Sequence, residues 1–122
     1  MRIPILKLKD TLLVSIQMDL SDDDALQFQE DLVGQTRDSL AAGVVIDITA
    51  LEVVDSFMAR VLNDTANMVR LVGAETVICG MQPAVALTLT EMGRELVGVE
   101  TALNLDQAVD RLDELIEIRS RI

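Results

Sequence analysis

Two short runs of aliphatic residues constrain the fold of this 122-residue chain more than any other feature. They cover residues 44–48 and 76–79. Short, continuous apolar runs are typical of strands that are buried on both faces, as in parallel sheets covered by helices. Helical patterns separate these runs from each other and from further strand-like segments, so strands and helices alternate along the chain. Alternation of this kind predicts an α/β fold with a mostly parallel sheet.

The N-terminal segment predicts an antiparallel hairpin at one edge of that sheet. Residues 3–8 and 11–17 have the pattern of two strands, joined by the short connection Lys9-Asp10. Pro4 and the charged side chains of Lys7 and Lys9 would blunt the exposed edge. We therefore expect a single domain over residues 1–122, with this edge hairpin and about four helices.

The first helix is predicted to begin at Ser21, with three aspartates at residues 22–24 in its first turn. Successive helical positions point in different directions, so capping of the helix dipole explains this triplet better than a metal site. We expect Gly43 to end the helix. The apolar stripe of this helix is predicted to comprise Ala25, Leu26, Phe28, Leu32, Val33 and Leu40.

Two further helices are predicted in the C-terminal half of the chain. One follows Pro83 over residues 84–92 and is closed by Gly93. A weak strand at residues 99–101 separates it from a last helix, which Asn104 caps. The inner face of the last helix is predicted to comprise Leu105, Ala108, Val109, Leu112 and Ile116.

The composition argues against several classes of function. A net charge of −11 repels phosphate backbones and anionic lipids. The two aromatic residues, Phe28 and Phe57, provide no stacking platform for single strands. The lone Cys79 is expected to be a small buried hydrophobe, which suits a reducing compartment, and no apolar stretch approaches the roughly 20 residues of a membrane helix. We expect a cytoplasmic protein that binds neither nucleic acid nor membranes.

The side chains that usually perform catalysis are also scarce. The chain has no His and no Tyr, so a serine nucleophile would lack its usual base. No His/Cys cluster suits zinc, and residues 80–83 lack the spacing and the Lys of a phosphate-binding loop. Paired carboxylates could still serve glycoside chemistry, although no sugar-stacking aromatics accompany them. We predict no catalytic residue, no metal and no cofactor.

One hydroxyl nevertheless occupies a distinctive place, since Ser56 follows Asp55 where a second helix is predicted to begin. That helix continues to about Leu71, and Gly73 ends it. The expected inner face comprises Met58, Val61, Leu62, Thr65, Met68, Val69 and Val72. Helical spacing also predicts a polar stripe opposite this face, comprising Ser56, Arg60, Asn63, Asn67 and Arg70. This stripe is not acidic, so a partner could dock there.

Two interpretations of Ser56 remain at this point. A phosphate on its hydroxyl would add about −1.5 to −2 charges, which the helix N-terminus and Arg60 would tolerate. Alternatively, Asp55 or Ser56 only caps the helix and Arg60 is an ordinary solvated charge. On residue chemistry alone, the capping interpretation is the better supported.

A family resemblance changes this balance. Asp47-Ile48-Thr49 after a buried strand, and Asp55-Ser56 opening a helix, resemble the signature of STAS domains, named for sulfate transporters and anti-sigma factor antagonists. The resemblance covers the whole chain. Phe57 and Met58 replace the small residue and Gly of the free antagonists, and this departure resembles the stressosome members of the family. Residues 12–17, 25–32 and 82–86 resemble those members too.

The resemblance implies a non-catalytic scaffold and switch protein within a large hetero-oligomer that contains a second STAS protein. It implies that this assembly holds a serine/threonine kinase, which phosphorylates Ser56 and leaves, and that a phosphatase resets Ser56. Contacts with the kinase or another partner are expected at Asp55, Ser56, Phe57, Met58, Arg60, Asn63 and Asn67. The alternatives are a free anti-sigma factor antagonist controlled through Ser56, and a small enzyme or ligand-binding domain of similar architecture.

Overall fold

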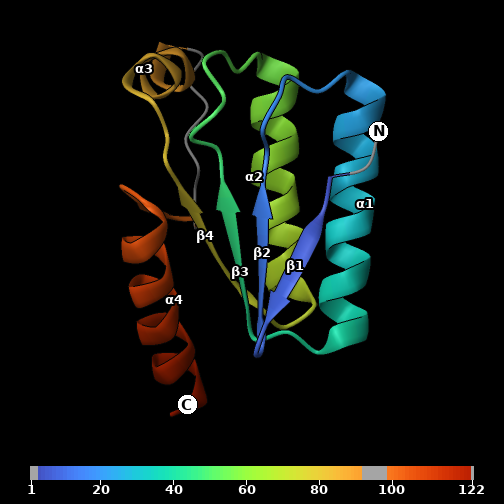
Figure 1. Cartoon of the computed structure of the whole chain (residues 1–122), viewed down its shortest axis with the longest axis vertical. Helices are drawn as coiled ribbons and strands as arrows, with labels where there is room; N and C mark the ends of the chain where they lie inside the picture. The colour runs from blue at the N-terminus through green and yellow to red at the C-terminus, as the bar shows by residue number, and fades with distance from the viewer. Residues whose placement is uncertain (1–2, 92–98, 122) are drawn as a thin grey trace.

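The computed structural model describes residues 3–91 and 99–121 (Figure 1). Within these residues, five strands form one sheet in the order β1-β2-β3-β4-β5. The strands are β1 (Ile5–Leu8), β2 (Thr11–Ser15), β3 (Gly43–Asp47), β4 (Glu75–Cys79) and β5 (Glu100–Ala102). β1 is antiparallel to β2, and all later neighbours are parallel. The predicted α/β fold with an antiparallel edge hairpin is confirmed.

The helices form unequal layers on the two faces of the sheet. α1 (Asp22–Ser39) and α2 (Ser56–Leu71) lie side by side on one face, and α4 (Leu105–Ser120) lies on the other (Figure 1). The short α3 (Pro83–Glu91) lies beyond the carboxyl end of β4 (Figure 1). No helix in the described part of the chain is both long and apolar enough to span a membrane.

The alternation of side chains along each strand builds a separate core on each face. The residues in or directly after the strands that face α1 and α2 are Leu12, Val14, Ile16, Val44, Ile46, Ile48 and Ile78. They pack against Phe28, Leu32, Ala59, Leu62 and Val69. The smaller core beneath α4 comprises Val45, Val77, Cys79, Ala108 and Leu112. Cys79 is fully buried, as predicted.

Side-chain caps define the starts of three helices at the predicted residues. Ser21 Oγ accepts a hydrogen bond from the backbone N–H of Asp24 at 3.1 Å. Asp55 Oδ1 accepts one from Met58 at 2.8 Å, and Asn104 Oδ1 accepts one from the residue three positions on at 2.9 Å. Each cap satisfies a backbone donor that has no partner within its own helix.

The predicted end of the first helix is wrong. α1 ends at Ser39, and Leu40 adopts a left-handed backbone with φ of 54°. The N–H groups of Leu40 and Ala41 bond back to the carbonyls of Arg37 and Thr36, which closes the helix before Gly43. Gly43 instead begins β3, where a Cβ atom would lie only 2.7–2.8 Å from three side-chain carbons of Leu112. The glycine is needed for this close packing with α4.

Several residues predicted to face inward are more than a third exposed. They are Leu26, Leu40, Met68, Val72, Leu105 and Val109. Leu40 and Val72 are the C-cap residues just beyond α1 and α2, and the other four belong to helices whose central stripe is buried as predicted, for example through Phe28, Leu62 and Leu112. The apolar stripes are wider than the strip of helix surface that contacts the sheet, so residues at their margins stay in solvent. The predicted helix end at residues 92–93 lies outside the described residues.

Candidate functional site

Ser56 lies where the parallel strands end, at the carboxyl edge of the sheet. The chain leaves β3 after Asp47, crosses this edge and enters α2 at Ser56 (Figure 1). Asp55 is the N-cap, so Ser56 is the first helical residue, and both side chains are exposed. The sequence prediction of an accessible hydroxyl in the first turn is confirmed.

The loop before Ser56 is anchored by its own apolar side chains. Leu51 is 2% exposed and Val54 is 1% exposed, and both belong to the core beneath α1 and α2. The N–H of Leu51 donates to the carbonyl of Ile48 at 3.0 Å, which makes a tight turn. Val53, between these anchors, is 72% exposed. The loop therefore has a fixed inner side and an open outer side.

Asp47 organises the first residues of this loop. Its Oδ1 atom accepts hydrogen bonds from the backbone N–H of Thr49 at 2.9 Å and from the Thr49 hydroxyl at 2.5 Å. The backbone N–H of Ile48 donates to the carbonyl of Cys79 at 3.0 Å, so the loop leaves the sheet still bonded to β4. The Asp-Ile-Thr motif thus has a structural role, and the Thr49 hydroxyl is already engaged.

The loop between β4 and α3 contacts Asp47 and Thr49 from the other side. Gln82 Nε2 donates a hydrogen bond to the carbonyl oxygen of Thr49 at 2.7 Å. Gly80 has a left-handed φ of 78°, and a Cβ atom there would overlap Thr49 Oγ1 and approach Asp47 Oδ1 to 3.0 Å. The sequence excludes residues 80–83 as a phosphate-binding loop, but this contact was not predicted from it. A glycine directly after a buried strand was the signal for a close backbone approach.

Phe57 and Met58 take different positions beside Ser56. Both are partly buried, but Met58 packs against the core beneath α1 and α2. Met58 also lines a hollow of about 210 Å³ together with Asp19, Leu20, Leu51, Val53 and Asp55. Phe57 is not among the side chains that pack against this core or line this hollow.

The predicted polar stripe on α2 is unevenly exposed along the helix. Arg60 is exposed one turn after Ser56, whereas Asn63 and Asn67 are partly buried. Within the described residues, Asn63 Oδ1 is buried with no hydrogen-bond partner. Arg70 lies 14 residues beyond Ser56, which places it about 21 Å away along the helix. Of the stripe, Arg60 thus lies nearest to Ser56, and Arg70 lies at the far end of α2.

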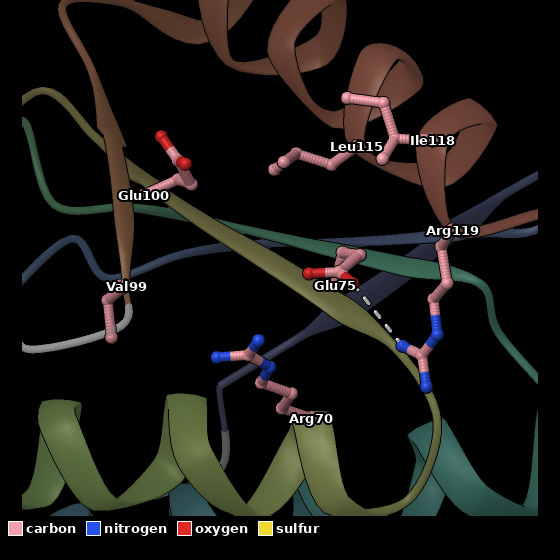
Figure 2. Close-up of a pocket in the computed structure, with 7 residues that line it drawn as sticks. All are labelled: Arg70, Glu75, Val99, Glu100, Leu115, Ile118 and Arg119. Carbon is pink, nitrogen blue, oxygen red and sulfur yellow. Dashed lines mark hydrogen bonds and ion pairs between the residues drawn. The ribbon is translucent and has the colours of Figure 1, made fainter. Parts of the chain in front are cut away.

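Arg70 belongs instead to a second hollow, of about 710 Å³, between α2, β4, β5 and α4 (Figure 2). Its guanidinium points into this hollow, on the opposite side of Glu75 from Arg119 (Figure 2). Arg119 is paired with Glu75 at 3.5 Å. Glu100 also lines the hollow and is paired with Arg111 at 3.0 Å. Acidic and basic groups are thus mixed here, and the hollow lies away from Ser56.

The carboxylates near Ser56 are engaged in structural hydrogen bonds. Asp55 is committed to the α2 cap and Asp47 to Thr49, so neither carboxylate is directed at the Ser56 hydroxyl by these bonds. Burial, and to a lesser degree the charge of Asp47, raises the pKa of the Cys79 thiol to about 11. That thiol therefore stays neutral near pH 7. Among the described residues, no group of three or more acidic, His or Cys side chains could hold a metal ion.

The chain belongs to the STAS domain family, whose model matches residues 2–108. Among solved structures, it is similar to a serine-to-glutamate variant of RsbS from Moorella thermoacetica. The two share 44% sequence identity with a TM-score of 0.84, over 96% of this chain and 99% of that one. A chain from a structure of the stressosome, described as a signal integration and transduction hub, is 47% identical with a TM-score of 0.80. That match covers 92% of this chain and 97% of the other.

Among curated proteins, it is similar to the RsbT co-antagonist protein RsbRA of Bacillus subtilis. The two are 30% identical over 93 residues, which cover 76% of this chain and 34% of RsbRA. The chain thus spans about a third of the length of that relative. The anti-sigma factor antagonist SpoIIAA is 13% identical with a TM-score of 0.72, a likeness that shows the shared fold alone. The high identity over nearly full length places the chain beside the RsbS-like stressosome STAS proteins.

Proposed function

We propose that this chain is a non-catalytic scaffold and switch protein of a stressosome. In this proposal it binds and sequesters an RsbT-like serine/threonine kinase, together with an RsbR-like STAS protein in a large hetero-oligomer. Phosphorylation of Ser56 releases the kinase, which then acts on a stress-response or related signalling pathway. A phosphatase resets Ser56. Because such a kinase uses ATP, the exchange would take place in the cytoplasm.

The single observation that carries this proposal is the placement of Ser56. Its hydroxyl is exposed at the first residue of α2, while the neighbouring hydroxyls are engaged or buried. Thr49 Oγ1 bonds to Asp47, and Thr65 is fully buried with its hydroxyl bonded to the carbonyl of Val61. A kinase approaching this edge of the sheet would therefore find Ser56 the most accessible acceptor of these three.

Electrostatics explain how one phosphate could change binding without unfolding the domain. The N-terminus of α2 favours a negative charge, and Arg60 lies one helical turn from Ser56. Asp19, Asp47 and Asp55 add negative charge on the same edge. The phosphate would add about −1.5 to −2 charges to this edge, which changes what can dock there.

A free anti-sigma factor antagonist is the alternative within the family. The contrast between 44–47% identity to the RsbS and stressosome chains and 13% identity to SpoIIAA favours the scaffold. Sedimentation with an RsbR-like partner distinguishes the two proposals. A discrete particle far larger than a dimer supports the scaffold, and partners that sediment separately support the free antagonist. Phe57→Ser should reduce the particle fraction, because it removes apolar contact area beside Ser56.

The decisive experiment combines the full chain with the RsbT-like kinase of the same genome and ATP, followed by mapping of phosphorylated residues. We expect one major phosphosite at Ser56, and loss of phosphorylation in Ser56→Ala. Ser120→Ala is the matched control, because Ser120 is an exposed serine at the far end of α4. Phosphorylation elsewhere, or unchanged phosphorylation of Ser56→Ala, would overturn the proposal. Ser56→Glu should lower kinase binding while Ser120→Glu leaves it unchanged.

A further inference from the structure

The loop that presents Ser56 is bound to its neighbour through one side chain. Gln82 Nε2 donates to the carbonyl oxygen of Thr49 at 2.7 Å, across 33 positions of sequence. Gly80, two residues earlier, lies against the same threonine, with its Cβ position only 3.0 Å from Thr49 Cα. Side-chain and backbone contacts therefore converge on Thr49 from the β4–α3 loop.

The backbone of Gln82 is itself fixed by α3. Its carbonyl oxygen accepts the N–H groups of Val85 and Ala86, each at 3.0 Å, so Gln82 is the residue from which α3 starts. Val85 is 1% exposed and Leu89 is 5% exposed, and both anchor α3 in the core. The side chain that reaches Thr49 thus projects from a firmly placed point.

A short, ordered path leads from Thr49 to Ser56. Beyond Thr49, the chain is held at Leu51 and Val54 by burial and ends at the Asp55 cap. Besides the bonds of Asp47 to Thr49 and of Asp55 to Met58, the hydrogen bond from Gln82 is the one side-chain bond to residues 49–55 that the structure shows within the described residues. Its loss would leave the start of this loop dependent on Asp47 and the neighbouring backbone.

We propose that Gln82 is a positioning residue, which sets the conformation of residues 49–55 and thereby presents Ser56 for phosphorylation. This inference rests on the proposed function. Gly80 allows this contact, because only a residue without a side chain leaves room for Thr49. Gln82 does not contact the kinase's phosphate donor in this proposal, and it acts only through Thr49 and the loop.

The test compares Gln82→Met with the wild-type full chain. Methionine keeps the length of the side chain but removes the N–H donor. Gln27→Met is the matched control, because it removes an amide hydrogen bond to Asp31 of 2.8 Å within α1. Gln82→Lys is the rescue, because its ammonium group can again donate to Thr49.

The readouts are amide hydrogen exchange and the kinetics of Ser56 phosphorylation. Urea unfolding checks that each variant is folded. In Gln82→Met, the backbone amides of Thr49 and Leu51, which donate to Asp47 and Ile48, should exchange about three- to tenfold faster, as loss of one hydrogen bond predicts. With the RsbT-like kinase, kcat for Ser56 should fall by a similar factor with KM unchanged. Gln27→Met should match the wild type in both, and Gln82→Lys should recover both.

The outcomes separate this inference from the proposed function. If wild-type Ser56 is phosphorylated and Gln82→Met shows wild-type exchange and wild-type kcat, the positioning role is wrong and the proposed function stands. If wild-type Ser56 is not phosphorylated, the proposed function fails, and with it the kinetic role of Gln82. Amide exchange still decides, in that case, whether Gln82 holds the loop.

Discussion

The two faces of the sheet are covered to different extents. α1 and α2 together bury the face that carries Val44, whereas α4 alone packs across β3, β4 and β5 on the face that carries Val45. Leu13 lies at the margin of the α4 core, and its partner in β1 is Leu6. Leu6 is 61% exposed and Leu8 is 64% exposed, so the hairpin end of this face stays open to solvent.

This difference predicts that two fully buried residues can differ in how tightly their surroundings constrain them. Val44 and Val45 are adjacent in β3, and both are 0% exposed. Val44 lies in a core closed by two long helices, where neighbours have little freedom to move into a cavity. Val45 faces a single helix that has solvent on its other sides. We expect the α4 face to adjust to changes more readily.

The largest effects should come from deleting the same two methyl groups on each face. Val44→Ala should lower the free energy of unfolding by about 2–3 kcal/mol, and Val45→Ala by about 1–2 kcal/mol, because the cost of a cavity depends on how far the site collapses. Urea unfolding of both variants at one pH measures this. Equal losses, or a larger loss for Val45→Ala, would contradict the unequal constraint of the two faces.

The closest contact on the α4 face gives the next effect. Gly43→Ala would place a methyl group against Leu112, and we expect a loss of about 1–3 kcal/mol from this overpacking. Combining it with Leu112→Val should recover part of that loss, since a shorter side chain makes room. A double-mutant cycle by urea unfolding measures the coupling. If the two changes in the free energy of unfolding add strictly, α4 shifts as a whole and residue 43 has no specific contact with residue 112.

Cys79 offers a pH-dependent measure of the same face. The folded state holds its thiol proton to about pH 11, whereas an unfolded thiol loses it near pH 8.5. The folded state binds more protons in this window, so stability should fall as pH rises from about 8.5 towards 11, by roughly 1–2 kcal/mol. Urea unfolding at pH 8 and pH 10.5 tests this against Cys79→Ala, whose stability should fall less. Parallel pH curves for the two proteins would refute the effect.

The smallest effect should be found at the open end of the α4 face. Leu8→Lys replaces an exposed leucine on the edge strand, and the free energy of unfolding should change by no more than about 0.5 kcal/mol. Leu12→Lys is the contrasting control, because Leu12 is fully buried and should not tolerate a charge. A loss above about 1 kcal/mol in Leu8→Lys would show that this surface is covered in solution.

Local signals predicted much of the fold. Ser21, Asp55 and Asn104 cap the helices that the sequence assigns to them, because a cap depends on residues within one turn. The alternation of strands and helices predicted the parallel sheet and its edge hairpin. The mistaken role of Gly43 has a distant cause, since the residue that requires a glycine there is Leu112, in α4. No pattern near Gly43 contains that information.

The candidate site also has features that local sequence predicted and features that distant elements set. Ser56, in the first turn after Asp55, was predicted from a motif and from helical spacing, and the structure places both residues as expected. Helical spacing predicts the polar stripe from one helix alone. It therefore contains no information that Asn63 and Asn67 are partly buried or that Arg70 faces another hollow. The environment of each residue depended on elements that spacing along α2 does not describe.

The sequence by itself determined the order of strands and helices, the helix caps and the exposed hydroxyl of Ser56. These follow from interactions within a few residues and from the periodicity of apolar side chains. Only the tertiary structure decided that two helices cover one face and one helix the other, and that Gln82 meets Thr49. Parallel strands bring their carboxyl ends to one edge, so loops more than 30 positions apart in sequence become neighbours only when the sheet forms.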